Sequence, residues 1–434
     1  MKKIIYKLQK GKAMNPLLPR CFFVPDAEAR VMPDGRLYLY GSQDISGEKD
    51  YCSKEYRIFS TDDPKMETWT HHGVSVRNTK DNSDIPFSPD VNLYAPDCVY
   101  CKGKYYLYVC GANRFEAVLE SDKPEGPFTN ARPIIGANGD SIDPAVFVDD
   151  DGQAYYFWGQ FRLKGALLKD DMATLDSDSI KDSILTEMEH GFHEGASIRK
   201  YGKKYYLLYT DISGGRATRL SYATADSPLG PYKKIGTVID NIYCDPQSWN
   251  NHGSIECFKG QWFVFYHRSS QNSKTSRRVC AERIYFNEDG TIQKAEMTSQ
   301  GASDPISAFG KIDASVACRV KGNVYISPDN QSKGHDSEVN EVLVNAGGGN
   351  WIEDWAEYRY IDFCDGAYLW KLRAKGQGSV SVMVEDYDIV GTQDVNTEEF
   401  KEISGELIQK VNGIKSVWLL IKGQGISIDW FGFE

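Results

Sequence analysis

The sequence predicts an all-β chain made of a five-bladed β-propeller, residues 14–305, and a C-terminal β-sandwich of jelly-roll type, residues 306–434. Three observations lead to this prediction. A strand–turn–strand unit recurs five times, the recurrence stops near residue 305, and alternating strand-like segments follow it. Repetition at a period of tens of residues is typical of propellers and other repeat folds.

The repeats are marked by five short aromatic segments. Tyr, Phe, Trp, Leu and Val dominate each one, and these residues favour strands. Each segment follows a turn that contains glycine, which is a hairpin signal. The five segments are RLYLYGSQD from Arg36, KYYLYVCGA from Lys104, QAYYFWGQ from Gln153, KYYLLYTD from Lys204 and QWFVFYHR from Gln261. Their spacing leaves room for four strands in each repeat, whereas a simple sandwich would repeat its turns every ~8–12 residues.

A polar residue opens the apolar run before each of these turns. Because the innermost strand of each blade lines the axis of a propeller, equivalent positions of the repeats should meet there. The five openings are Asp26, Asp97, Asp143, Glu194 and His252. The alternative interpretation is a set of solvated turn residues.

Four clustered carboxyl groups suit glycoside hydrolysis. Like charges raise one another's pKa, so one acid of such a cluster stays protonated while another ionises. Hydrolysis of a glycosidic bond needs one acid in each state. The pattern alone does not say which acid has which part.

Composition narrows the range of partners. The net charge of −11 and the pI of about 5.3 argue against nucleic acid and against an anionic membrane surface, and favour a neutral ligand. No apolar run reaches the ~18 residues of a membrane helix. The opening MKKIIYKLQKGKAM has no apolar stretch of a secretory signal, so we expect a cytoplasmic protein, or a secreted one if a leader has been removed.

The ten cysteines lie mostly within apolar runs, and we expect them to be reduced core residues. Cys98 and Cys101 form a CVYC motif, but no second pair stands at zinc-site spacing.

From Asn15 to Pro305 the chain resembles glycoside hydrolase family 43. The matching phrases are NPLLPRCFFVPDAEARV, YAPDCVYCKGKYYLY, SIDPAVFVDDDGQAYY, HEGASIRKYGKKYYLLY and NNHGSIECFKGQWFVFYHR. The resemblance implies a five-bladed propeller that cleaves with inversion of the anomeric carbon. It further implies that Asp26 is the general base, that Glu194 is the general acid, and that Asp143 orients that acid and keeps it protonated. In many relatives proline follows the first Asp, whereas Ala27 stands here.

The resemblance also suggests binding residues. His252 matches an axial histidine that faces a calcium ion in many relatives; a plain hydrogen-bonding part in the channel is the alternative. Asp97 would shape the sugar pocket. Arg278 would reach the bound sugar, with Arg277 as the alternative, and either arginine could instead be an ordinary surface residue. The remaining candidates are rim residues (His190 and His193) and packing residues (His267 and Arg268).

The C-terminal segment from Val339 to Glu434 resembles family 6 carbohydrate-binding modules, chiefly through WIEDWAEYRYIDF and LLIKGQGISIDWFGFE. Such modules often use an aromatic platform and an Asn two residues before the final Asp-Trp. Here Ser427 stands at the Asn position, and Tyr358 and Phe400 are the candidate platforms. Sugar binding and a purely supporting domain both remain open.

The resemblance implies an exo-acting, inverting glycosidase for xylosyl or arabinofuranosyl linkages of oligosaccharides or polysaccharides, with no organic cofactor. Four alternatives remain: an exo-galactosidase, a retaining glycosidase of the fructan-cleaving kind, a non-catalytic sugar-binding propeller and a protein-interaction scaffold. Because one fold carries many of these functions, the site has to separate them.

Overall fold

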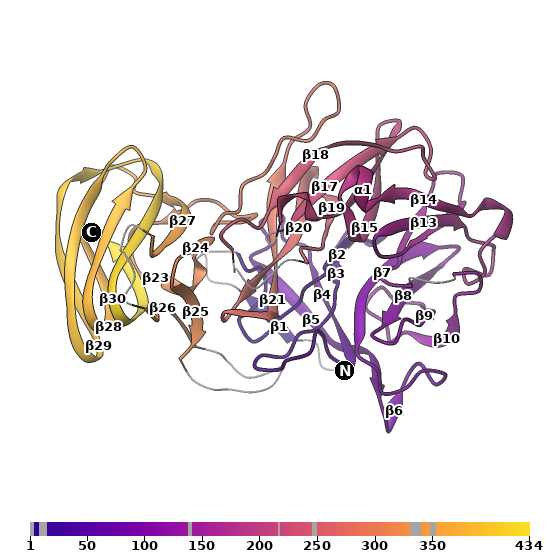
Figure 1. The fold of residues 1–434 in the computed structure, drawn as a ribbon, viewed down its shortest axis with the longest axis horizontal. Coiled ribbons are helices and arrows are strands. Elements are labelled where there is room, and N and C mark those ends of the chain that lie inside the picture. The colour runs from indigo at the N-terminus through magenta and orange to yellow at the C-terminus, as the bar shows by residue number, and fades with distance from the viewer. Residues whose placement is uncertain are drawn as a thin grey trace.

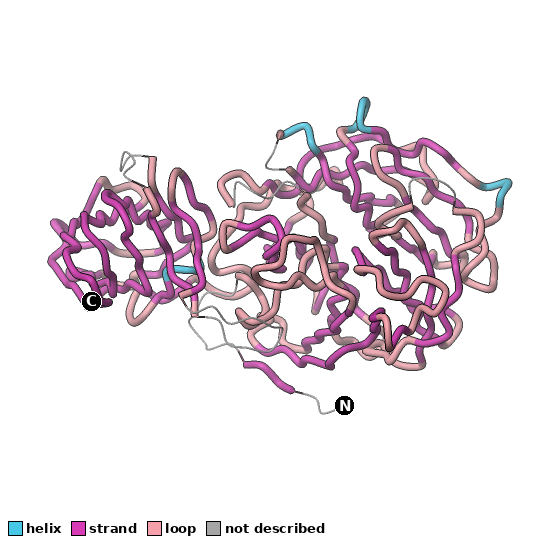
Figure 2. The backbone as a smooth tube through the Cα atoms, turned by 60° about the horizontal axis from the view of Figure 1, so that its bottom comes forward, coloured by secondary structure: helices cyan, strands magenta, loops and turns pink. Residues whose placement is uncertain are grey.

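The computed structural model describes residues 4–7, 15–137, 141–215, 218–244, 250–329, 340–347 and 353–434. Figure 1 shows two all-β parts side by side, with the C-terminal part in orange and yellow. Strands dominate both parts (Figure 2). The helices within these ranges are short, and none is long and apolar enough to cross a membrane: α1 (Glu187–His190) and the 3-10 helices η1 (Ser177–Ser179), η2 (Ile212–Gly214) and η3 (Ala314–Val316).

Five antiparallel sheets follow one another along the chain and form the predicted blades. The first sheet contains β1 (Ile4–Lys7), β2 (Glu28–Val31), β3 (Leu37–Tyr40), β4 (Glu55–Thr61), β5 (Thr68–Thr79) and β6 (Asn82–Ser83). The second contains β7 (Leu93–Cys101), β8 (Lys104–Gly111), β9 (Glu116–Ser121) and β10 (Thr129–Pro133). The third contains β11 (Ala145–Val148), β12 (Ala154–Trp158), β13 (Arg162–Leu167) and β14 (Lys181–Thr186). The fourth contains β15 (Phe192–Tyr201), β16 (Lys204–Asp211), β17 (Arg219–Ala225) and β18 (Lys233–Asp240), and the fifth β19 (Ser254–Phe258), β20 (Gln261–Ser270) and β21 (Ser273–Ile284).

The innermost strands form a closed ring. Strands β2, β7, β11, β15 and β19 contact one another in this order, and β19 returns to β2. A separate apolar core fills the space between each pair of adjacent blades. In β20, Phe263 and Phe265 face the first blade while Val264 and Tyr266 face the fourth. Because both faces of a blade are buried, its strands are apolar almost without interruption, which is the pattern that revealed the repeats.

Among the described residues, the fifth blade has three strands instead of the expected four. Residues before β2 cover its open edge: the Leu17 amide donates to the Val279 carbonyl at 3.0 Å, and Asn15 accepts from the Ala281 amide at 2.9 Å. Leu17 also packs in the core between the first and fifth blades. The chain before the first blade thus closes the ring, which the repeat pattern alone did not show.

The C-terminal domain is all-β, as predicted. Its nine strands are hydrogen-bonded into one sheet, antiparallel except for the β22–β27 pair: β22 (Ile306–Ser307), β23 (Ile312–Asp313), β24 (Arg319–Lys321), β25 (Val324–Pro328), β26 (Glu341–Asn345), β27 (Trp355–Asp362), β28 (Ala367–Val384), β29 (Ile389–Val411) and β30 (Ile414–Phe433).

Two pairs of predicted strands, YLWKLRA with GSVSVMVED and SVWLLIKG with GISIDWFGFE, are continuous as β28 and β30. Glycines lie where each pair joins. Gly378 (φ 151°) faces Gly423 (φ 133°) across the two strands, and a Cβ at Gly378 would lie 2.1 Å from the Lys422 carbonyl oxygen. The strands therefore continue through these positions only because no side chain stands there.

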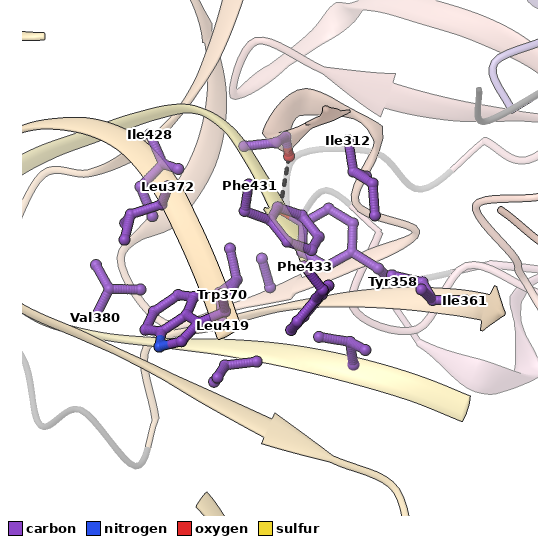
Figure 3. Close-up of a cluster of buried hydrophobic side chains, with 14 of the residues drawn as sticks. Ile312, Tyr358, Ile361, Trp370, Leu372, Val380, Leu419, Ile428, Phe431 and Phe433 are labelled. Atoms are coloured by element: carbon purple, nitrogen blue, oxygen red, sulfur yellow. Dashed lines mark hydrogen bonds between the residues drawn. The ribbon is translucent and has the colours of Figure 1, made fainter. Parts of the chain in front are cut away.

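Of the three residues considered for sugar binding by this domain, Tyr358 and Ser427 are buried. Tyr358 lies in the apolar core beside Phe431 (Figure 3), is 0% exposed and donates its hydroxyl to the Ala314 carbonyl at 2.7 Å. Ser427 is buried and pairs with Val344 of β26. Phe400 lies under the cationic groups of Arg373 and Lys375. Tyr358 therefore cannot serve as a stacking platform.

The two parts of the chain are joined by buried polar contacts. Arg278 of β21 forms a two-pronged ion pair with Glu341 of β26, at 2.8 and 2.9 Å. Arg20 pairs with Asp313 at 2.6 Å, and Arg268 donates to the Ala317 carbonyl at 3.3 Å. The ten cysteines form no disulfide, and eight of them are buried, as expected for core residues.

Candidate active site

Four of the five predicted openings meet in one cavity. Asp26, Asp143, Glu194 and His252 line a hollow of about 350 Å³ at the ends of the innermost strands. They come from four different blades. A volume of this size lies within the range of small-molecule binding sites, ~300–1,000 Å³.

Asp26 and Asp143 occupy equivalent positions in the first and third blades. Each stands two residues before its innermost strand, and each has a left-handed backbone, with φ of 56° and 53°. The Asp26 amide donates to Nδ1 of His267 at 3.3 Å, and the Asp143 amide donates to Sγ of Cys110 at 3.4 Å. His267 and Cys110 lie on the second strands of the preceding blades. Left-handed backbone costs a non-glycine residue energy, and such positions concentrate at functional sites.

Glu194 reaches the cavity from an irregular part of β15. The register between β15 and β16 shifts on both sides of this residue, and Gly195 has φ of 69°. A Cβ on Gly195 would lie 2.8 Å from Oγ1 of Thr210 and 3.0 Å from the His252 ring. A bulge re-aims side chains at the edge of a sheet, and here it turns Glu194 toward the axis.

Asp26 is held ionised. Burial raises the pKa of Asp26, whereas Arg277, the neighbouring rings of His267 and His252 and the hydrogen bond from Ser42 lower it, and the net shift is downward. Nη1 of Arg277 donates to Oδ1 at 3.1 Å, and Oγ of Ser42 donates to Oδ2 at 2.7 Å. Burial and the nearby Arg277 lower the pKa of His267 to about 3, so this ring is neutral and its Nδ1 accepts the amide hydrogen of Asp26.

Arg277 is fixed by a second carboxylate. Its Nε and Nη2 donate to Asp44 at 2.9 and 3.0 Å, and its guanidinium lies 4.8 Å from the centre of the Tyr51 ring. Asp44 is 0% exposed and accepts the backbone amides of Cys52 and Arg277 as well. A planar, two-sided guanidinium suits this bridging position, because it can serve both carboxylates at once.

A proton is retained on the opposite side of the cavity. Burial, the neighbouring charge of Glu194 and the charge of Asp26 raise the pKa of Asp143 well above its ordinary value. The Gly195 amide hydrogen-bonds to the Asp143 carboxylate and offsets part of this effect. Glu194 accepts a hydrogen bond from Nε2 of Gln160 at 2.8 Å, and Nε2 of His193 lies 3.9 Å from the same oxygen. The cavity thus has one ionised wall and one wall that keeps a proton, which is the division of labour that acid–base chemistry needs.

His252 stands between the two walls. Its Nδ1 lies 3.9 Å from Oδ1 of Asp26 and 3.8 Å from Oδ2 of Asp143. Calcium takes six to eight oxygen ligands, and the described residues contain no group of three or more His, Cys, Asp or Glu placed to hold a metal ion. Calcium at His252 stays a prediction.

Asp97 does not reach this cavity. It lies inside β7, is 1% exposed, and its two oxygens accept from Arg30 at 2.7 and 2.9 Å and from the Val146 amide at 2.7 Å. Glu28 and Arg199 extend the same ion-pair network across the axis. Burial and the charge of Glu28 raise the pKa of Asp97 to about 6 although Arg30 opposes them. Asp97 was expected to shape the sugar pocket. In the structure it joins the first three blades instead.

Arg278 is also absent from this cavity, because it faces the C-terminal domain and pairs with Glu341. Its alternative, Arg277, lines the cavity. Of the remaining candidates, His193 lines the cavity too. His190 caps the turn at Thr186 with its Nδ1, and Arg268 donates to Cys280 and Ala317.

Sequence reasoning missed Gln160 and Arg114, which line the cavity, and Asp44, which is buried behind Arg277. Asp44 and Gln160 share one signal: each ends a segment quoted for the repeats, RLYLYGSQD and QAYYFWGQ, just after the second strand of its blade. Arg114 follows the second strand of another blade in the same way. The loops after these strands therefore point to the cavity, and their polar residues were readable as candidates.

The comparisons with known proteins agree with the fold and the acidic cavity. Residues 14–292 match the model of glycosyl hydrolases family 43. A xylosidase/arabinosidase of Thermoclostridium stercorarium is 32% identical over 72% of this chain and 72% of its own. A β-xylosidase/α-arabinofuranosidase from a compost microbial metagenome, solved with xylotriose in a calcium-free form, is 29% identical with a TM-score of 0.56, and it aligns over 66% of this chain and 98% of its own.

The fold of the whole chain has a counterpart as well. A family 43 arabinoxylan arabinofuranohydrolase from Bacillus subtilis, solved with cellotetraose, aligns over 98% of each chain with a TM-score of 0.57 at 22% identity. The five-bladed propeller with carboxyl groups at its axis is that of a glycoside hydrolase. The chain belongs to glycosyl hydrolases family 43, and it is an enzyme of the xylosidase/arabinosidase type.

Proposed function

We propose that the protein is an inverting exo-glycosidase that removes terminal xylosyl or arabinofuranosyl residues from oligosaccharides, with Asp26 as general base and Glu194 as general acid. The observation that supports this most is the opposed state of the two walls. Arg277 and Ser42 favour an ionised Asp26, whereas burial and the charge of Glu194 favour a protonated Asp143.

In the proposed reaction, the terminal sugar occupies the cavity with its anomeric carbon between the two walls. Asp26 accepts a proton from a water molecule, and the oxygen of that water forms a bond to the anomeric carbon. The bond from this carbon to the glycosidic oxygen breaks at the same time, and its electron pair goes to the leaving oxygen. Glu194 gives its proton to that oxygen. Attack from the face opposite the leaving group inverts the anomeric centre.

Asp143 would act through Glu194. It is more deeply buried than Glu194 and it touches the Gly195 amide next to the proposed acid. A second buried carboxyl group keeps a proton in this wall when the site is free, because two adjacent negative charges repel each other. Once substrate arrives, the proton is needed on Glu194, the carboxyl group less enclosed by the protein.

The proposal is tested with Asp26→Asn and Glu194→Gln. Each change should lower kcat on nitrophenyl xylosides or arabinofuranosides by a factor of about 10²–10⁴, the usual contribution of an acid or base. Glu189→Gln changes an exposed acid of α1 and serves as the control. NMR of freshly formed product should show inversion.

Four results would change this proposal, each in a different way. Near-normal turnover by either variant would remove its residue from the mechanism. A retained anomeric configuration would favour the fructan-cleaving type, in which the first Asp attacks carbon. Turnover of galactosides alone would leave the mechanism standing and change the substrate. The absence of turnover on all three sugar classes would favour a sugar-binding or scaffold propeller.

A further inference from the structure

Two side chains beside Glu194 form a chain of hydrogen bonds that the mechanism above leaves unused. Nη2 of Arg114 donates to Oε1 of Gln160 at 2.9 Å, and Nε2 of Gln160 donates to Oε2 of Glu194 at 2.8 Å. All three residues line the same cavity. Arg114 is exposed, whereas Gln160 and Glu194 are half-buried.

The backbone holds Gln160 in place. The amide of Gly159, on one side of it, donates to the Ile142 carbonyl at 3.1 Å, and the amide of Phe161, on the other, donates to the His193 carbonyl at 2.7 Å. Gln160 is therefore tied to the residues that precede Asp143 and Glu194. Its side-chain amide is held by the hydrogen bonds to Arg114 and Glu194.

The guanidinium decides which way round the amide lies. Arginine only donates hydrogen bonds, whereas a glutamine amide has one accepting end and one donating end. Arg114 must therefore face the carbonyl oxygen of Gln160, which leaves the NH₂ group for Glu194. Oε2 of Glu194 is thereby an acceptor.

We propose that Arg114 and Gln160 are positioning residues that keep the acidic proton of Glu194 on Oε1. A protonated carboxyl group carries its hydrogen on one oxygen, and Oε2 already receives the hydrogen of Gln160. The proton thus stands on the oxygen that Gln160 does not occupy, the one left to meet the leaving group. This inference rests on the proposed role of Glu194 as general acid.

Substitutions at Arg114 test the donor-to-acceptor direction of these hydrogen bonds and leave the carboxyl groups unchanged. Arg114→Lys keeps a side chain that only donates and should retain turnover. Arg114→Met frees the amide to turn over and should lower kcat/KM a few-fold. Arg114→Glu offers only acceptors to the NH₂ group, so the amide should reverse, present its oxygen to Glu194 and draw the proton to Oε2. We expect the largest loss, about tenfold, for this variant, since ordinary acid catalysis contributes ~10²–10⁴ in total.

The readout is the dependence on the leaving group. Aryl glycosides of phenols with high pKa need a proton on the leaving oxygen. Fluoride and dinitrophenolate are good leaving groups and depart from their glycosides without protonation. The losses in kcat/KM should appear with aryl glycosides of high-pKa phenols and vanish with glycosyl fluorides and dinitrophenyl glycosides. Gln160→Leu should lower kcat/KM as much as Arg114→Glu does. It should also move the basic limb of the kcat/KM profile to higher pH, because the ionised Glu194 carboxylate loses a hydrogen-bond donor.

Equal effects of Arg114→Lys and Arg114→Glu would overturn the proposal. So would a Gln160→Leu variant whose losses are the same on fluorides and on poor leaving groups, with an unshifted pH profile, since that is the pattern of a structural residue. Failure of the proposed function would look different: Glu194→Gln would then keep full activity toward poor leaving groups in the otherwise unchanged enzyme.

Discussion

Replacing Glu116 by Gln should remove a large pH-dependent loss of stability from the propeller. Glu116 is the first residue of β9 and is 6% exposed. Within the described residues, neither carboxyl oxygen has a hydrogen bond of ordinary geometry, although Tyr156 lies beside them. Burial raises the pKa of Glu116 from 4.5 to about 8, and the nearby Tyr156 and Lys164 offset only part of that rise.

The direction in which pH changes the free energy of unfolding follows from the protons that the folded and unfolded states bind. Between pH 4.5 and 8 the unfolded chain has released this proton while the folded chain retains it. The free energy of unfolding therefore falls as pH rises through this range and is fully restored below it. At ~1.4 kcal/mol for each pKa unit, the loss amounts to about 3 kcal/mol at pH 7 and about 5 kcal/mol above pH 8.

The assay is thermal or denaturant unfolding of the wild type and Glu116→Gln between pH 4 and 9. Burial of the amide adds a cost that does not vary with pH, so the informative quantity is the difference between the two proteins as pH rises. That difference should move in favour of the variant by several kcal/mol, or several degrees in Tm. Glu120→Gln, on the same strand, is the matched control, because its hydrogen bond to Lys104 lowers its pKa and gives the opposite sign. Parallel pH profiles of the wild type and Glu116→Gln would refute the reasoning.

Three further predictions concern the cavity and the contact between the two parts of the chain. Asp143→Asn should lower kcat about tenfold or more and move the basic limb of the kcat/KM profile to lower pH, because the charge that opposes a second ionisation is gone. Arg277→Met combined with Asp44→Asn removes the ion pair between these two residues and leaves Asp26 without its cation. The acidic limb should move to higher pH because the cation that lowers the pKa of Asp26 is lost. Arg278→Met should cost about 3 kcal/mol of stability by stranding the buried Glu341 carboxylate, yet leave KM for small glycosides unchanged; a raised KM would restore Arg278 to the sugar pocket.

The order of the blades was readable from the sequence because each blade buries both faces. Runs such as KYYLYVCGA and QWFVFYHR have no polar face, so they stand out, and they became β8 and β20. The polar openings of the repeats then gave four of the residues that line the cavity. The fifth, Asp97, does not line it, because Arg30 and the Val146 amide hold its carboxylate. Glu194 also lies inside its strand, but the irregular register of β15 turns it toward the cavity.

The choice between Arg277 and Arg278 shows a second limit of prediction from sequence. Successive residues of a strand point to opposite faces, so one arginine of β21 meets Asp26 and the other meets the C-terminal domain. The sequence shows the alternation but not which face is which. That depends on the register of β21 against β20 and on the position of Glu341, which lies 63 residues further along the chain.

Local composition and periodicity were sufficient to predict the strands of the five repeats, the acidic residues that open them and an all-β C-terminal part. The folded chain was needed to show which acids share a cavity, which of them is ionised, and how Gln160 and Arg114 are hydrogen-bonded to Glu194. These properties arise from charges and hydrogen bonds between residues far apart in the chain, and their strength depends on burial and on distances of a few ångströms.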